Sequence, residues 1–159
     1  MTIEVGERLP QGEFKTMTKD GVISLDVDSV FKDQRVALFS VPAVFTPGCS
    51  GVHLPSYVNA YESIMNKGFD TIACLSVSDA WVMDAWAESY EAKGKVLMLA
   101  DGNAAYVKQL GLESDLTPFG MGMRSKRFSM VVVDGRVESL NIDERKIEST
   151  NALHTCALK

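Results

Sequence analysis

The 159-residue sequence has few of the residues on which several classes of protein depend. It contains three cysteines, no Cys-x-x-Cys pair and two histidines. An odd and small number of cysteines is poor material for a disulfide framework, and the set is equally poor for a structural zinc site. We therefore expect no metal or other cofactor, and we expect any disulfide to be catalytic rather than structural.

Long apolar runs and an excess of positive charge are also missing. No run approaches the ~20 residues of a membrane-spanning helix, and the first ten residues lack the charged-then-apolar layout of a signal peptide. The 16 lysines and arginines stand against 21 acidic residues, for a net charge of -5. This balance argues against a general nucleic-acid binder or a basic membrane-surface protein. We expect a cytoplasmic protein.

What is present is the composition of an ordinary globular domain. Hydrophobic residues make up 46% of the chain and charged residues 23%, which is typical of proteins with one buried core. We find no internal repeat, low-complexity tract or linker. The sequence therefore predicts a single domain over residues 1–159.

Apolar runs and helical patterns alternate along the chain from residue 35 onward. Apolar spacing, helix caps and the turn signal Asp134-Gly135 predict the order strand, helix, strand, helix, strand, short helix, hairpin, helix. The strands are expected at 35–41, 69–77, 96–100, 127–133 and 136–142, and the helices from Cys49 to Gly68, over 80–93 and 104–110, and from near Thr150. Alternating units need right-handed crossovers onto one sheet, to which the hairpin adds an antiparallel edge. The sequence therefore predicts an α/β fold of thioredoxin-like topology, a mixed central sheet flanked by helices.

Some finer expectations concern the segments between these elements. The first thirty or so residues suggest one or two peripheral strands, and 113–124 suggests a loop. Pro55 lies inside the helix after Cys49, where it should bend the axis. The last helix should be capped by Ser149 or Thr150. The inward faces are expected to comprise Val82, Met83, Trp86 and Tyr90 in the 80–93 helix, and Leu153, Cys156 and Ala157 in the last one.

Cys49 stands at a turn from a buried strand into a helix. Unpaired backbone N–H groups and the positive end of a helix dipole at such a turn favour a thiolate, which is the nucleophilic form of cysteine. Thr46 is close enough for its hydroxyl to bond the sulfur or a ligand, and Gly48 lets the backbone approach a reacting atom. The alternative from these residues alone is a buried structural cysteine in a Pro/Gly turn.

The residues around Cys49 resemble those of a known family. The pattern Pro-x-x-x-Thr-x-x-Cys, from Pro42 to Cys49, resembles the peroxiredoxin active-site signature, and 41–50 with His53-Leu54-Pro55 is similar to the peroxiredoxin-5-like subfamily. Other similar segments are 73–80, 94–96, 99–101 and 126–132. The resemblance extends from about residue 35 to 143.

The resemblance implies roles for four residues. Cys49 would be the peroxidatic cysteine, which attacks a peroxide oxygen and becomes a sulfenic acid. Thr46 would hydrogen-bond the peroxide, and Pro42 would shield the sulfenic acid from over-oxidation. Arg127 would place its guanidinium beside sulfur and peroxide, where a permanent positive charge favours the thiolate. Without the resemblance, Arg127 is equally well explained as a strand-edge arginine that solvates one face.

Three further residues, Phe45, Phe119 and His53, each have two possible explanations. Phe45 and Phe119 could line an apolar pocket for alkyl hydroperoxides, with Gly48 beside it, although packing alone explains both rings. His53 lies one helical turn from Cys49. A Cys/His pair would suggest acyl transfer, whereas members of the subfamily have a structural histidine there.

The fate of the sulfenic acid depends on the other two cysteines. Cys74 lies in a predicted core strand, and Cys156 lies on a predicted helix face, so each is a possible resolving cysteine but better explained by packing. The resemblance implies a thiol-dependent peroxidase for hydrogen peroxide and organic hydroperoxides, with glutathione, glutaredoxin or thioredoxin as reductant. It also implies a homodimer, formed through loops near Asp79–Trp81 and Thr117–Phe119. The alternative is a peroxide-sensing redox relay without sustained turnover.

Overall fold

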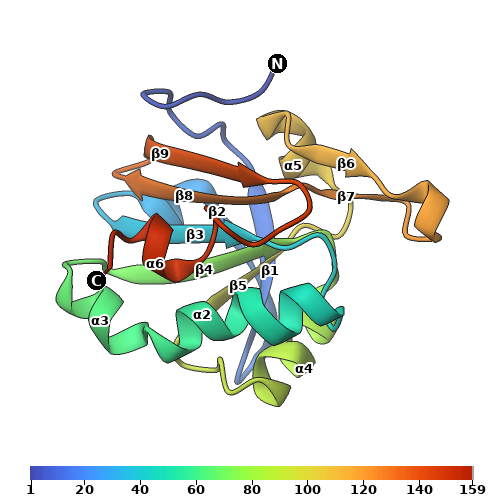
Figure 1. Cartoon of the computed structure of the whole chain (residues 1–159), viewed down its shortest axis with the longest axis horizontal. Helices are drawn as coiled ribbons and strands as arrows, with labels where there is room; N and C mark the ends of the chain where they lie inside the picture. The colour runs from blue at the N-terminus through green and yellow to red at the C-terminus, as the bar shows by residue number, and fades with distance from the viewer. Residues whose placement is uncertain (159) are drawn as a thin grey trace.

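The computed structural model describes residues 1–158, which form a central sheet covered by helices on both faces (Figure 1). Seven strands lie in the order β2-β1-β5-β4-β3-β8-β9. Their bounds are β1 Glu13–Thr18, β2 Gly21–Asp26, β3 Arg35–Ser40, β4 Thr71–Ser76, β5 Leu97–Ala100, β8 Arg127–Val133 and β9 Arg136–Asp143. Strands β3, β4 and β5 are parallel, β8 pairs antiparallel with β3, and β9 pairs antiparallel with β8. The predicted thioredoxin-like α/β fold is confirmed.

Two layers of helices bury the faces of the sheet. One core contains Phe39, Cys49 and Cys74 and is covered by α2 (Leu54–Asn59), α3 (Tyr61–Asn66), α4 (Ala80–Ser89) and α6 (Ala152–Thr155). The other core, around Leu38 and Leu75, is covered by α1 (Val27–Phe31) and α5 (Ala105–Leu110). Neighbouring residues of β3 and β4 point to opposite faces, and all but the first residue of each strand are buried. Both strands are therefore covered on both sides. None of the helices within residues 1–158 is long and apolar enough to cross a bilayer.

The segment after Cys49 differs from the single bent helix that its apolar spacing predicts. Cys49–His53 forms a π-helical turn, in which the Leu54 N–H donates to the Cys49 carbonyl, and α2 and α3 follow with a break at Ala60. Pro55 has no N–H, and its ring would collide with the carbonyl four residues earlier in a regular α-helix. The wider π turn gives that ring room, so the proline lies at the start of α2 instead of bending a longer helix.

Several smaller expectations are also corrected. Residues 113–124 are not a plain loop, because β6 (Glu113–Asp115) and β7 (Met123–Ser125) pair antiparallel on either side of a short 3₁₀ turn. Asp79 does cap α4, but Val82 is 39% exposed rather than inward. The cap of α6 is Asn151 rather than Ser149 or Thr150. Cys156 is buried as predicted, but Leu153 is 57% exposed and Ala157 is also exposed, so the predicted inward face is wrong for these two residues.

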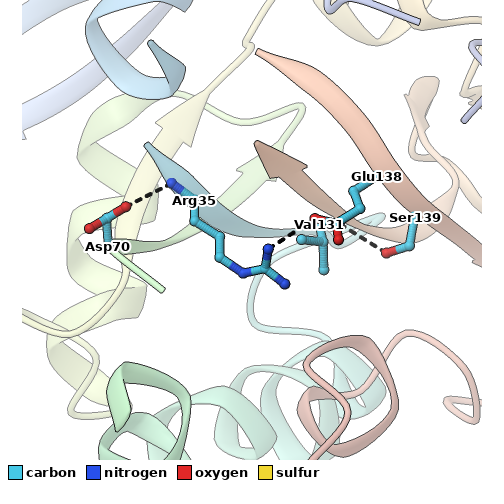
Figure 2. Close-up of polar contacts among 5 residues, drawn as sticks. All are labelled: Arg35, Asp70, Val131, Glu138 and Ser139. Carbon is cyan, nitrogen blue, oxygen red and sulfur yellow. Dashed lines mark hydrogen bonds and ion pairs between the residues drawn. The ribbon is translucent and has the colours of Figure 1, made fainter. Parts of the chain in front are cut away.

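The β8–β9 hairpin forms at Asp134-Gly135 as predicted, with an irregularity that the pattern does not reveal. Val132 pairs with Val137, but Val131 pairs with Ser139, so Glu138 is an extra residue in β9. Such a bulge shifts every later pair by one position and moves the later side chains to the other face. Figure 2 shows this region, where the Ser139 hydroxyl accepts a hydrogen bond from the Val131 N–H and Glu138 reaches Arg35.

Candidate active site

Cys49 lies in the first helical turn after β3, at the carboxyl ends of the parallel strands. Gly48 already has helical backbone angles, and the Ser50 N–H donates to the Thr46 carbonyl at 2.9 Å. The Cys49 side chain is 1% exposed. Its sulfur therefore lies in a largely desolvated setting at the positive end of a helix, where electrostatic interactions are stronger than in water.

Arg127 is brought to this sulfur by the sheet. It begins β8, whose next residue pairs with Ser40 at the end of β3. The Arg127 Nη2 atom lies 3.1 Å from Cys49 Sγ. A guanidinium stays charged at any ordinary pH and donates without accepting, so this contact favours the thiolate. The structure thus joins two residues that lie 78 positions apart in the sequence.

His53 contacts the arginine rather than the sulfur. Its Nδ1 atom lies 2.6 Å from Arg127 Nη1, and its Nε2 atom lies 3.0 Å from the Thr150 carbonyl oxygen. Because the guanidinium can only donate, Nδ1 must accept, and the proton of the neutral ring is on Nε2. Burial lowers the pKa of His53 to about 3, and the charge of Arg127 acts in the same direction. A ring held neutral, with Nδ1 occupied, is badly placed to deprotonate Cys49.

Thr46 and Pro42 flank the turn. The Thr46 hydroxyl donates to the Ala43 carbonyl at 2.6 Å, so its oxygen keeps its lone pairs for another donor. Pro42 is half-buried. The geometry is compatible with the roles assigned to Cys49, Thr46, Pro42 and Arg127, and these roles stay predictions.

The residues proposed to line the substrate pocket are not gathered at one place. Phe45 lines a surface cavity of about 580 Å³ with Val77 and Arg124, and its φ of 64° is a strained conformation for a bulky residue. Phe119 does not line that cavity; it is 75% exposed in the hairpin that extends away from the sheet (Figure 1). Gly48 has an ordinary φ of -68°, and a Cβ on it would lie 3.5 Å from Arg127 Nη2. Because 3.5 Å is an ordinary contact distance, neither the backbone angles nor the space around this position requires a glycine.

Another surface cavity, of about 760 Å³, lies away from Cys49. It is bounded by β1, β5, α3 and α4 at the other end of the strands. We assign the chemistry to the Cys49 turn because reactive groups meet there, whereas the cavity holds mainly apolar side chains and lysines. Within residues 1–158, no three His, Cys, Asp or Glu side chains gather in a way that could hold a metal ion.

Cys74 and Cys156 are free and buried in the same core as Cys49. Burial raises the pKa of the Cys74 thiol well above its ordinary value, and burial raises that of Cys156 to about 12. Both groups therefore remain protonated at neutral pH, and a buried thiol is a poor nucleophile. This setting agrees with the expectation that packing explains both residues.

The contacts behind His53 were not expected from the sequence. The Thr150 carbonyl accepts from His53 and, at 2.7 Å, from the Tyr57 hydroxyl, and Asp143 binds the Thr150 N–H and hydroxyl. The Asp134-Gly135 turn was the one sequence feature from which the position of Asp143 could have been inferred. A regular hairpin counted from that turn, however, places Ile142 opposite Arg127 and Asp143 on the other face. The bulge at Glu138 is what brings Asp143 opposite Arg127.

Comparison with known proteins agrees with this geometry. The sequence matches the Redoxin family over residues 4–154. It is 41% identical over 143 residues to Peroxiredoxin-2C of Oryza sativa subsp. japonica, covering 89% of this chain and 88% of that protein. It is 38% identical to the chloroplastic Peroxiredoxin-2E of Arabidopsis thaliana, covering 90% of this chain and 63% of that protein.

Solved structures give the same result. Reduced Prx3 from Vibrio vulnificus in complex with hydrogen peroxide superposes with a TM-score of 0.94 at 41% identity, over 98% of each chain. Peroxiredoxin 5 from Alvinella pompejana superposes with a TM-score of 0.84 at 30% identity, over 99% of each chain. The chain therefore belongs to the peroxiredoxins, a family of thiol-dependent peroxidases.

Proposed function

We propose that this chain reduces hydrogen peroxide and organic hydroperoxides through Cys49 and is recycled by an external thiol. The observation that carries the proposal is the 3.1 Å contact between Arg127 Nη2 and Cys49 Sγ. It places the permanent positive charge of a guanidinium beside a nearly buried sulfur, which is the setting of a reactive cysteine. The hydrogen peroxide complex of Prx3 from Vibrio vulnificus supports the substrate class.

The proposed step is a displacement on oxygen. The Cys49 thiolate attacks one peroxide oxygen, so that the S–O bond forms while the O–O bond breaks and sulfur loses two electrons. The leaving hydroxide or alkoxide takes a proton from solvent and becomes water or an alcohol. Arg127 stabilises the negative charge that moves onto the departing oxygen. Thr46, whose own proton is donated to Ala43, accepts a hydrogen bond from the peroxide O–H.

The proposed reductant lies outside the chain. A first thiol condenses with the Cys49 sulfenic acid to give a mixed disulfide and water, and a second thiol releases Cys49 and leaves as a disulfide. We propose glutathione, alone or through glutaredoxin, or thioredoxin for this role. The burial of Cys74 and Cys156 supports this one-cysteine cycle, because neither sulfur presents a thiolate to Cys49.

The intact mass of the protein after one equivalent of hydrogen peroxide, under non-reducing conditions, tests the one-cysteine cycle. We expect the gain of one oxygen atom. Loss of two hydrogen atoms would show an internal disulfide and contradict the proposal. If it occurs, the matched variants Cys74→Ser and Cys156→Ser identify the partner, because only one of them abolishes the loss.

Turnover separates the enzyme from a redox relay. We expect sustained peroxide consumption with glutathione and glutaredoxin or with thioredoxin, lost in Cys49→Ser and retained in Cys156→Ser. A single oxidation of Cys49 that none of these thiols reverses would favour the relay. Comparison of hydrogen peroxide with an aryl hydroperoxide then tests Phe45, because Phe45→Ala should slow only the bulkier substrate.

We also propose that the chain forms a homodimer near the active site. Large apolar side chains are exposed in the segments proposed for the interface: Phe45 at 49% in the Cys49 turn, Trp81 at 65% at the start of α4 and Phe119 at 75% in the β6–β7 hairpin. Large exposed apolar groups on one side of a protein commonly mark an interface. Sedimentation equilibrium should show a dimer that Trp81→Glu weakens, while the matched change at the exposed Leu153 leaves it intact. Equal masses for wild type and Trp81→Glu would contradict this interface.

A further inference from the structure

Asp143 lies directly opposite Arg127 in the β8–β9 ladder. Directly opposed side chains share a face of the sheet and lie close together, so a carboxylate and a guanidinium there are expected to form an ion pair. They do not form one in the part of the chain that the structure describes. Arg127 instead directs its terminal nitrogens to Cys49 and His53.

The carboxylate of Asp143 is occupied by the segment that follows it. It accepts hydrogen bonds from three backbone N–H groups and two hydroxyls at 2.6–3.2 Å, contributed by Glu148, Ser149 and Thr150. Burial alone would raise the pKa of Asp143, but the hydrogen bonds from Ser149 and Thr150 outweigh it and lower the pKa to about 2. Both carboxylate oxygens are thus occupied by residues 148–150, and the Arg127 guanidinium bonds Cys49 and His53 instead.

The segment that Asp143 holds carries the acceptor for His53. Thr150 is fully buried, and its carbonyl oxygen accepts hydrogen bonds from His53 Nε2–H and from the Tyr57 hydroxyl. A carbonyl only accepts, so it requires the proton on Nε2. The unprotonated Nδ1 then faces Arg127. Hydrogen bonds therefore connect Asp143 to Cys49 without a break, through the main chain of Thr150 and the side chains of His53 and Arg127.

We propose that Asp143 is a positioning residue of the peroxidatic site, which acts on Cys49 through Thr150, His53 and Arg127. By holding residues 148–150 it keeps the Thr150 carbonyl in place, which keeps His53 in the tautomer that accepts from Arg127. By saturating its own oxygens it also leaves the charge of Arg127 to the sulfur. The proposal deepens the proposed function, since its consequence for peroxide reduction rests on Cys49 being the reacting group.

Asp143→Asn tests the proposal, because an amide has one acceptor oxygen and would turn its NH₂ toward N–H donors. We expect a loss of about 10- to 100-fold in the single-turnover rate constant for oxidation of Cys49 by hydrogen peroxide, the size of effect that small misplacement of a catalytic group produces.

Asp26→Asn is the matched control. Asp26 is likewise a capping carboxylate, which accepts from the Ser29 N–H and hydroxyl, but it has no path to His53. We expect this variant to lose stability without losing rate. Equal rate losses in the two variants, or an unchanged rate in Asp143→Asn, would show that Asp143 serves stability only.

Two measurements keep the proposal testable if Asp143→Asn folds poorly or the proposed function fails. Thr150→Val removes one hydroxyl donor to Asp143 and keeps the carbonyl, and it should produce a smaller loss that Thr150→Ser restores. Nitrogen-15 NMR of His53 reports the tautomer without any peroxide, with His154→Gln used for assignment. We expect the Nε2–H form in wild type and a mixed population in Asp143→Asn. An unchanged His53 signal would overturn the proposal, whereas a wild-type Cys49 inert to peroxide would overturn the proposed function alone.

Discussion

Two arginines begin strands near opposite ends of the same sheet, and their surroundings differ. Arg35 begins β3, where its guanidinium forms an ion pair with Glu138 at 3.0 Å and lies 4.8 Å from the centre of the Phe69 ring. Its backbone N–H donates to Asp70 at 2.8 Å (Figure 2). Arg127 begins β8 and contacts the neutral ring of His53 and the sulfur of Cys49.

The difference lies in what balances each charge. Glu138 neutralises Arg35 at a position where both side chains are largely open to water, and such pairs contribute little to stability. Arg127 has a neutral partner, while the nearest cross-strand carboxylate, Asp143, is bound to its own loop. A charge without a fixed counterion can stabilise a thiolate or a departing oxygen. In the proposed mechanism, reactivity at one end of the sheet therefore depends on Arg127 having no neutralising partner.

Removing the two arginines in turn is the strongest test of this contrast. Arg127→Ala should lower the rate constant for peroxide reduction by roughly 100- to 1000-fold, the usual cost of losing one donor that stabilises developing charge. Arg127→Lys should recover part of the rate, because lysine keeps the charge but not the paired donors. Arg35→Ala should leave the rate unchanged. Stopped-flow measurement of Cys49 oxidation checks all three, and a large effect at Arg35 would remove the distinction.

The pH dependence of the free energy of unfolding tests whether His53, which contacts Arg127, is neutral in the folded protein. The pKa of His53 falls from the ordinary 6.5 to about 3 because of burial and the Arg127 charge, so the unfolded state binds more protons between these values. Stability is then fully present above pH ~6.5 and is lost as the pH falls toward ~3. A shift of this size corresponds to about 5 kcal/mol of stability lost over this pH range through His53.

His53→Gln should flatten the pH dependence, because a glutamine cannot take up a proton. Denaturant unfolding at several pH values measures the slope, with His154→Gln on the exposed histidine as control. An identical slope in wild type and His53→Gln would contradict a neutral buried His53.

The smallest effect is expected at the neutralised arginine. Glu138→Gln should lower the free energy of unfolding by about 0.5 kcal/mol, and a double-mutant cycle with Arg35→Met should give a coupling of under ~1 kcal/mol. Added salt should shrink this coupling, because the pair is exposed. Thermal unfolding with and without salt measures it. A coupling of several kcal/mol would contradict the expectation that the Arg35–Glu138 ion pair contributes little to stability.

Local sequence patterns predicted the parts of the fold that depend on local chemistry. Alternation of apolar runs, the Asp79 cap and the Asp134-Gly135 turn each act over a few residues, and each is present in the structure. The π turn before Pro55 and the bulge at Glu138 were missed, since each adjusts a regular element to residues packed against it. The β6–β7 hairpin was missed because its strands are three residues each, too short for an alternation to be seen.

By itself, the sequence determined the class of fold and pointed to the candidate reactive centre. The strand-to-helix turn that places Cys49 at a helix start, with Thr46 three residues earlier, is encoded within a few neighbouring residues, because strand, turn and dipole are local properties. The family resemblance named Arg127, but only the tertiary structure decided that His53 contacts Arg127 rather than Cys49 and that Asp143 bonds its own loop rather than Arg127. These depend on the pairing of distant strands and on one inserted residue at Glu138, and such a shift in register reverses which side chains share a face.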